Sequence, residues 1–449
     1  MFLSCARSCY NDEERVRDPF YSLHYHMLCK TISQHTKHFR RRKEDMRFDF
    51  DTMLQRHGKD AIAVDAIGDA VDFARAPGAP KEGFDAIPMW VADMNFPTAP
   101  SIPMAVIRRA EHPAYGYFAP SEEYYDSIIR WHRLRNDVED LKPEHIGYEN
   151  GVLGCVASAM QAFTAPGEKF LLHSPTYIGF THVLEDNGRT AELSPLVKDE
   201  NGIWRMDYED MECRIKKNHI HFAVFCSPHN PCGRVWERWE IEKAMEIFRE
   251  NDVVVVSDEI WSDIILEGCK HTPTQSVSDD ARMRTIAIYA PSKTFNLAGL
   301  IGSYHIVYSP YLRDRLERQS LCCHYNDMNV LSMHALIGAY SDEGHAWADE
   351  LCQVLSKNVF YAYDFFRANF PDIEVMRPQG TYMMFLHCEE YCRKTGRTID
   401  EVIKAGWDVG VAWQQGAPFH DPWGIRMNFA VPYAYVKKAM QRLKDYVFV

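Results

Sequence analysis

Short apolar runs that end in polar residues recur through the middle of the chain. Residues 285–289 (TIAIY) mix β-branched and aromatic side chains, and residues 253–256 are four consecutive valines. Runs of this kind fit parallel strands that helices cover on both faces. Similar runs precede Tyr177 and Asn230. We expect buried strands whose carboxyl ends meet at one edge of a sheet, where open α/β sheets bind their ligands.

The stretch between two of these predicted strands has a different period. In residues 237–251 the apolar side chains fall at helical spacing, which places them on one face of a helix: Ile241, Ala244, Met245 and Phe248. A helix between two buried strands is the repeating unit of a parallel sheet. The sequence therefore predicts an α/β fold.

One chemically distinctive side chain lies at or just after the end of each of four predicted strands: Tyr177, Asn230, Asp258 and Lys293. Taken singly, each has an ordinary explanation. A lysine after a strand usually extends into solvent, an aspartate there often caps a helix, an asparagine suits a turn and a tyrosine suits a core. Because all four stand at strand ends, we expect them to share one site.

These four residue types are the set that a pyridoxal 5′-phosphate (PLP) enzyme needs. The cofactor is held as an imine on a lysine, and an acidic group keeps the ring nitrogen protonated so that the ring accepts electrons from the substrate. Lys293 and Asp258 suit these two roles. Asn230 is the candidate for hydrogen bonding to the ring oxygen, and Tyr177 for packing on the ring.

A phosphate group needs a helix N-terminus, and the segment 149–159 offers one. Gly151 permits close approach of the backbone, and the N–H groups of Val152 and Leu153 open a predicted helix. A helix that opens with glycine is common, so this signal is weak alone. The chain has no Walker or dinucleotide glycine-rich fingerprint that would indicate a nucleotide instead.

Six motifs resemble the fold-type I aminotransferase superfamily, and their details resemble its MalY/PatB branch of PLP-dependent carbon–sulfur β-lyases, often called cystathionine β-lyases. The motifs are PMWVADMNFPTAP (88–100), YGYF (115–118), SPHNPCGRVW (227–236), SDEIW (257–261), SKTFNLAGL (292–300) and IRMNFAVP (425–432). The resemblance runs from about residue 46 to the C-terminus.

The resemblance implies roles for individual residues. Lys293 would carry the cofactor, Asp258 would pair with the ring nitrogen, and Asn230 and Tyr177 would contact the ring. Arg426 would bind the substrate carboxylate, for which the planar fork of arginine is suited. Without the resemblance, an ordinary surface arginine on a strand would be an equally good interpretation. Ser292 would donate to the phosphate. The resemblance also implies a homodimer in which Tyr117 reaches the neighbour's cofactor phosphate.

Three positions depart from the common aminotransferase pattern. Ile301 stands where many aminotransferases have a phosphate-binding arginine, and Trp261 stands where aspartate aminotransferases have a tyrosine. Both features resemble the β-lyase branch. Ala290 replaces a frequent serine, which leaves Ser292 and the helix N-terminus as the local phosphate donors.

The domain boundaries follow from the resemblance. We expect a large cofactor domain at about 96–329 with a mostly parallel seven-stranded sheet, and a small α+β domain split between about 46–95 and 330–449. The active site would lie between them.

Residues 1–45 do not fit a targeting segment. They lack the apolar core of a signal peptide, and the acidic residues Asp12 and Glu13 are wrong for a mitochondrial transit peptide. They either precede the true start at Met46 or form a disordered tail with a basic patch.

Composition agrees with a large cytoplasmic enzyme. The 449 residues carry a formal net charge of −13, which argues against a general nucleic-acid or membrane-surface role. We find no apolar run near the roughly 18 residues that a membrane span needs. The 13 cysteines are scattered without a C-x-x-C pair, so their spacing suggests neither disulfides nor a zinc site, and they read as reduced thiols.

We therefore expect α,β-elimination from a small amino-acid substrate such as cystathionine or a cysteine conjugate, giving a thiol, pyruvate and ammonia. Two alternatives remain open from the sequence. An aminotransferase would use the same first proton abstraction but return the proton to the cofactor carbon. A regulatory protein would bind PLP and act by contacting a transcription factor, a role that some members of this branch combine with lyase activity.

Overall fold

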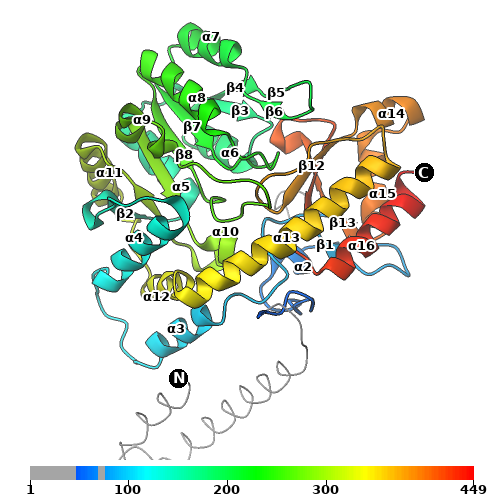
Figure 1. Ribbon diagram of the computed structural model, residues 1–449, viewed down its shortest axis with the longest axis horizontal. Coiled ribbons are helices and arrows are strands. Elements are labelled where there is room, and N and C mark those ends of the chain that lie inside the picture. Colours follow the sequence, from blue (N-terminus) through cyan, green and yellow to red (C-terminus); the bar gives the residue numbers. More distant parts are fainter. Residues whose placement is uncertain (1–46, 69–75) are drawn as a thin grey trace, which may run out of the picture. The chain divides into compact units, whose positions relative to one another are not determined.

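A seven-stranded sheet organises the computed structural model, which describes residues 47–68 and 76–449 (Figure 1). The strand order is β2-β10-β9-β8-β7-β3-β4. Only β10 runs antiparallel to its neighbours, so the prediction of a mostly parallel seven-stranded sheet is confirmed. The strands are β2 (Ile146–Glu149), β3 (Lys169–Ser174), β4 (Thr190–Pro195), β7 (Phe222–Cys226), β8 (Val254–Asp258), β9 (Thr285–Tyr289) and β10 (Ser303–Ile306). The predicted extension 1–45 lies outside the described residues.

Helices cover both faces of this sheet because alternate strand residues point to opposite sides. On β3, Leu171 packs with α7 (Tyr208–Asn218) and α8 (Arg238–Glu250), whereas Phe170 and Leu172 pack with α5 (Val152–Phe163), α6 (Ile178–Asp186) and α11 (Pro310–Cys323). The helix α9 (Asp279–Arg284) lies on the first of these faces. Double coverage explains why the strands read as nearly continuous apolar runs.

The predicted strand ends do meet at one edge. The strands β3, β7, β8 and β9 are successive parallel neighbours, and Asp258 at the end of β8 is in register with Cys226 and Ile288 on the adjoining strands. The strand predicted at 285–289 and the helix predicted within 237–251 both form, the latter as α8.

A second, antiparallel sheet of four strands lies nearer the C-terminus, in the order β11-β12-β15-β14. Its strands are β11 (Glu374–Val375), β12 (Met383–His387), β14 (Gln414–Gln415) and β15 (Gly424–Asn428). Close by in the chain are α14 (Glu389–Thr395), α15 (Ile399–Asp408) and α16 (Tyr433–Arg442). Two short strands, β1 (Ile87–Pro88) and β13 (Val411–Ala412), pair in parallel, which fixes the segment that follows β1.

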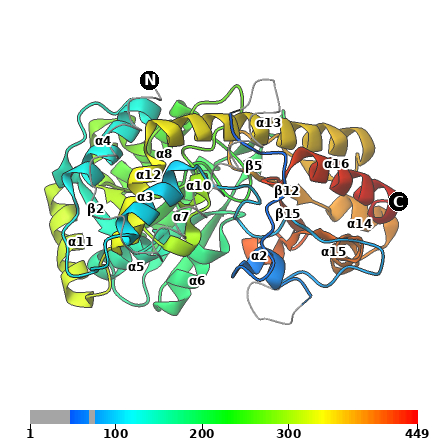
Figure 2. The same ribbon diagram turned by 90° about the horizontal axis from the view of Figure 1, so that it is seen from below.

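The 28-residue helix α13 (Asp342–Asn369) links the two sheets (Figure 1 and Figure 2). One part of it packs against α3 (Ser101–Ala110) and α12 (Val330–Ala339), and another part packs against α16 and β11. The remaining elements include α2 (Ile62–Asp65), α4 (Glu122–Asn136), α10 (Ser292–Phe295) and the hairpin of β5 (Val197–Lys198) with β6 (Trp204–Arg205). Residues 48–449 form one compact unit, and the boundary between a large and a small domain stays a prediction.

Among residues 47–68 and 76–449, no helix combines the length and the apolar character that crossing a bilayer requires.

Candidate active site

Lys293 lies on the short helix α10, four residues after the last residue of β9. Its Nζ donates a hydrogen bond to the main-chain oxygen of Ala92 at 2.9 Å and lies 5.7 Å from the centroid of the Trp261 ring. Burial lowers the pKa of Lys293 to about 8, and the neighbouring charge of Arg426 adds to this effect. A substantial fraction of this amine is therefore neutral near physiological pH, as a nucleophile or base requires.

Asp258 is the last residue of β8, and its side chain is buried. Burial raises the pKa of Asp258 to about 7, although a hydrogen bond from the Ile260 N–H to Oδ1 at 3.1 Å and the charge of Lys293 oppose the increase. A buried carboxyl with few donors around it gains most from a cationic partner. A protonated ring nitrogen would be such a partner.

Arg426 on β15 brings the second sheet to the same site. Its Nη1 donates to Asn230 Oδ1 at 3.2 Å, and its Nη2 donates to the Trp90 oxygen at 3.0 Å and to Gln414 Oε1 at 2.6 Å. Burial lowers the pKa of Arg426 to about 10, so the guanidinium remains a cation at neutral pH.

Two buried polar atoms at this position have no hydrogen-bond partner. One is Nε of Arg426 itself, and the other is the hydroxyl oxygen of Tyr382. Buried polar atoms usually have partners, and their absence needs an explanation. Two unpaired donors beside a buried cation suit the recognition of a carboxylate.

Tyr177, Val152 and Leu153 pack together against the core on the α5 side of the sheet. Gly151 precedes α5 with a φ of +83°, a conformation that favours glycine, and no side chain caps the helix. Its first N–H groups are thus available to an anion, as the sequence suggests. Burial raises the pKa of the Tyr177 hydroxyl, which stays protonated.

The structure thus gathers five of the predicted side chains, and we call the four at the strand ends the sheet-edge wall: Tyr177, Asn230, Asp258 and Lys293. Arg426 faces them. Ser292 lies half-buried beside Lys293 at the start of α10. Tyr117 is different, because it is fully exposed within a segment, 111–120, whose ten residues are all exposed.

The other side of the site, which we call the facing wall, consists of residues 90–94, Gln414 and Arg426. Sequence reasoning found Arg426 through the resemblance but missed residues 90–94 and Gln414. The main-chain oxygens of Trp90 and Ala92 accept hydrogen bonds from Arg426 and Lys293, and Asn428 Nδ2 donates to those of Val91 and Asp93 at 2.6 Å each. The motif around residues 88–100 indicated the family but not this role, since carbonyl groups leave no mark on side-chain patterns.

Two departures from the aminotransferase pattern have distinct environments. Trp261 is buried, and its ring meets that of Tyr382 edge-on at 4.8 Å. Ile301 is 53% exposed and adopts a φ of +44°, which is strained for a β-branched residue. Trp261 therefore lines the site beside Lys293, whereas Ile301 faces outward.

Comparison with known proteins agrees with this geometry. Residues 93–443 match the family described as aminotransferase class I and II. The cystathionine beta-lyase PatB of Bacillus subtilis is 34% identical over 368 residues, which cover 80% of this chain and 92% of that protein. Protein MalY of Escherichia coli is 30% identical over 76% of this chain and 83% of its own length.

Solved structures give the same result. Cystalysin from Treponema denticola, which contains a pyridoxal 5′-phosphate cofactor, superposes with a TM-score of 0.80 and 28% identity over 89% of this chain and 98% of its own. The PLP-bound C–S lyase from Staphylococcus hominis superposes with a TM-score of 0.79 and 27% identity, over 88% of this chain and 98% of its own.

The seven-stranded sheet with a partly buried lysine and a buried carboxyl at its edge defines the fold-type I class of PLP-dependent enzymes. Within that class, the chain belongs to the class I and II aminotransferase family.

Proposed function

We propose that the protein is a PLP-dependent carbon–sulfur β-lyase that cleaves cystathionine or a cysteine S-conjugate to a thiol, pyruvate and ammonia. The observation that carries this proposal is the position of Asp258 at the end of β8 and of Lys293 just after the adjacent parallel strand β9, with pKa values displaced toward neutrality, opposite the buried cation of Arg426. The relatives PatB and the Staphylococcus hominis C–S lyase support the choice of a lyase.

The donor set fits the cofactor. Lys293 would attach it, Asp258 would face its ring nitrogen, Asn230 would donate to its ring oxygen, and Tyr177 would cover its ring. The N–H groups of Val152 and Leu153, with the Ser292 hydroxyl, would hold its phosphate. When bound, PLP supplies an electron sink for the charge that deprotonation leaves on the substrate Cα.

The chain's own residues then divide the work. Arg426 binds the substrate carboxylate and so fixes which Cα bond stands perpendicular to the cofactor ring. Lys293, once the substrate amine has displaced it, accepts the Cα proton at Nζ, which its lowered pKa permits. The Cβ–S bond breaks with its electron pair on sulfur, and the released enamine hydrolyses to pyruvate and ammonia.

We further propose the domain division expected from the sequence, with residues 96–329 as the large domain and residues 46–95 and 330–449 as the small one. Arg426 and Asn230 then belong to different domains, and their hydrogen bond crosses the cleft. A substrate carboxylate that binds Arg426 draws the two domains together and excludes water.

We also propose a homodimer in which Tyr117 contacts the cofactor phosphate of the partner subunit. The fully exposed segment 111–120 supports this, because it carries three large aromatic side chains and follows α3, whose Met104 and Ile107 are also exposed. Exposed apolar groups of this size indicate a surface that another protein covers.

Subunit mixing tests the dimer. We expect K293A and Y117A homodimers to be impaired, and mixtures refolded together to regain activity, because each hybrid contains one site with both native residues. A mixture no more active than its components would show that Tyr117 serves no partner site.

Product analysis tests the reaction itself. Purified enzyme supplied with cystathionine should release pyruvate and thiol in equal amounts, and K293A should release neither. Incubation with sulfur amino acids and 2-oxoglutarate should yield little glutamate. Glutamate formation that exceeded pyruvate release for every substrate would overturn the lyase in favour of an aminotransferase.

We infer a reducing compartment, the cytoplasm, for this reaction. Ten cysteines among the described residues are free thiols, and several are buried in the core. Thiols persist in this form where the cell keeps them reduced.

A further inference from the structure

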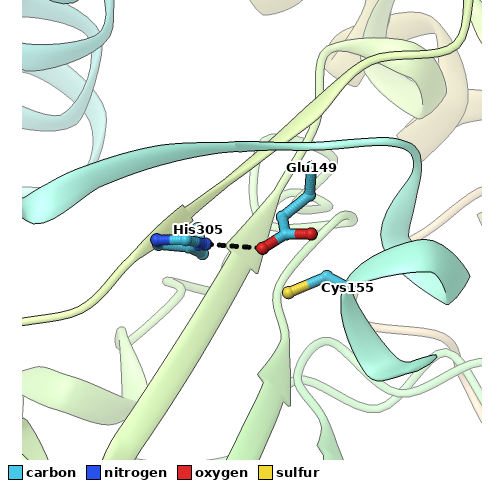
Figure 3. A group of neighbouring side chains, drawn as sticks. All are labelled: Glu149, Cys155 and His305. Atoms are coloured by element: carbon cyan, nitrogen blue, oxygen red, sulfur yellow. Dashed lines mark hydrogen bonds and ion pairs between the residues drawn. The ribbon is translucent and has the colours of Figure 1, made fainter. Parts of the chain in front are cut away.

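Three buried side chains with metal-ligating atoms meet beside the start of α5 (Figure 3): Glu149, Cys155 and His305. Glu149 is the last residue of β2, His305 lies on the adjoining strand β10, and Cys155 is in the first turns of α5. Nδ1 of His305 lies 2.8 Å from Glu149 Oε1, and the Cys155 thiol lies within 4.8 Å of both of these side chains' ligand atoms.

The ligand atoms of the three residues all lie within 4.8 Å of one another, and no other such group occurs in residues 47–68 and 76–449. In a tetrahedral zinc site with bonds of about 2.0–2.3 Å, ligand atoms stand about 3.3–3.7 Å apart. Side-chain rotations that move the ligand atoms by roughly 1 Å would bring them to these separations. A thiolate, an imidazole and a carboxylate are also the donors that zinc accepts in proteins.

We propose that Glu149, Cys155 and His305 bind a zinc ion, with a water molecule as the fourth ligand. Zinc displaces the thiol proton of Cys155, and the Nδ1 proton of His305 moves to Nε2 of the ring, which frees Nδ1 to bind the metal. A cysteine thiol is ordinarily protonated at neutral pH, and zinc binds it as the thiolate. Binding therefore releases about one proton from Cys155.

The surroundings support the three ligands as a built site. Asn326 Nδ2 donates to Glu149 Oε2 at 2.8 Å, and Asn326 Oδ1 accepts from the Asn150 N–H at 2.6 Å, so the carboxylate is oriented by a neighbour of the kind that metal ligands have. The His305 ring lies directly over Gly147 on β2, where any Cβ would stand 2.3 Å from ring atoms. Glycine at this position is therefore needed for the imidazole to reach Glu149.

Charge gives a second reason to expect a cation here. Glu149 is fully buried and stands two residues before Gly151, which opens the helix end that we propose for the cofactor phosphate. A buried carboxylate beside a phosphate disfavours that phosphate, whereas a divalent cation held by one carboxylate and one thiolate neutralises the local charge. This link to the cofactor rests on the proposed function, but the metal site itself does not.

The spacing of cysteines along the chain could not indicate this site. The three ligands come from two strands and a helix, separated by 6 and 150 residues, whereas the familiar zinc patterns place pairs of ligands within a few residues. The sheet register of β2 with β10, which aligns Glu149 with Ser303, is what brings His305 within reach.

Zinc content and X-ray absorption of the full-length holoenzyme test the proposal. We expect one equivalent of zinc per chain, beyond any zinc held elsewhere, to remain bound after dialysis against a weak chelator. X-ray absorption should show one sulfur ligand at a Zn–S distance of about 2.3 Å. C155S and H305Q should each lose this equivalent. C388S is the matched control, because Cys388 is likewise a fully buried thiol but belongs to no such group.

Circular dichroism and PLP absorbance identify variants that have not folded. Calorimetry of zinc binding in buffers of different ionisation enthalpy should detect the released proton in the native protein but not in C155S or H305Q. Zinc retained equally by C155S, H305Q and C388S would place the metal elsewhere and overturn the proposal. So would native protein that binds no zinc at micromolar concentration, which would leave the cluster as a hydrogen-bond network. Either result leaves the lyase proposal standing, since pyruvate release measures that separately.

Discussion

The sheet-edge wall and the facing wall of the site are assembled in different ways. The sheet-edge residues follow successive parallel strands, so neighbouring positions in the sheet fix Asp258 and Lys293 relative to each other. The facing wall joins segments far apart in the chain, and the bond between Arg426 and the Trp90 oxygen spans 336 residues. The hydrogen bonds between strands position the first wall, whereas the second depends on side chains that bind main-chain carbonyl groups.

The two walls also differ in charge. On the sheet-edge wall, burial displaces the pKa values of Asp258 and Lys293 toward 7 and 8, where both groups titrate near physiological pH. On the facing wall, Arg426 remains a cation. The difference suggests that one wall performs proton and electron chemistry and the other binds and orients. Substitutions on the first should therefore reduce kcat, and those on the second should mainly reduce kcat/KM.

The largest effect is expected for Lys293→Ala. Loss of the only amine in the sheet-edge wall removes both cofactor attachment and the base, so turnover should fall by at least about 10⁴-fold. The absorbance band of covalently attached PLP should disappear as well. Lys270→Ala is the control, because that lysine is exposed and pairs only with Asp137 on the surface. Steady-state pyruvate release measures both variants.

Asp258→Ala should retain bound PLP and lose roughly 10³-fold in kcat, because an electrostatic partner placed at the developing charge is worth about this much. Asp258→Glu, which keeps the carboxylate, should be milder. An alanine variant with nearly native turnover would remove Asp258 from the site.

Arg426→Ala should lower kcat/KM by about 10- to 100-fold, the value of hydrogen bonds to a charged group. Arg426→Lys keeps the charge but not the fork, and should recover only part of the loss. Equal effects of both variants on kcat at saturating substrate would contradict the division of roles between the walls.

The pH dependence of cofactor attachment sharpens the electrostatic contrast. Below pH 8 Lys293 is mostly protonated and unreactive, and above it the amine is neutral, so the rate at which apoenzyme attaches PLP should rise with a midpoint near pH 8. An ordinary lysine would show its midpoint near 10.5. In D258N the midpoint should move lower, because the Asp258 charge raises the pKa of Lys293. A midpoint above 10 would show that burial does not act on this amine.

The smallest effect on catalysis is expected for Asn428→Ala. The change leaves the oxygens of Val91 and Asp93 without their donor and should lower the free energy of unfolding by about 1–3 kcal/mol. Because the facing wall loosens, KM should rise only a few-fold. Thermal unfolding and steady-state kinetics test the two parts, and an unchanged KM would show that residues 90–94 hold their position without Asn428.

The two walls also explain what could be predicted from the sequence. Tyr177, Asn230, Asp258 and Lys293 could be grouped because strand periodicity is local and parallel strands share one edge. Arg426 was found only through the resemblance of its motif, since its partners Trp90 and Gln414 depend on how two sheets pack. Ala92, Tyr382 and the cluster of Glu149 with His305 could not be predicted, because tertiary contacts alone bring them together.

Borohydride reduction of the yellow holoenzyme, followed by peptide mapping, identifies the lysine that holds the cofactor. We expect one pyridoxyl group per chain, on the peptide that contains Lys293, and no label at that position in K293A. Label on any other lysine in the native enzyme would contradict the assignment of the sheet-edge wall and, with it, the roles given to Asp258 and Arg426.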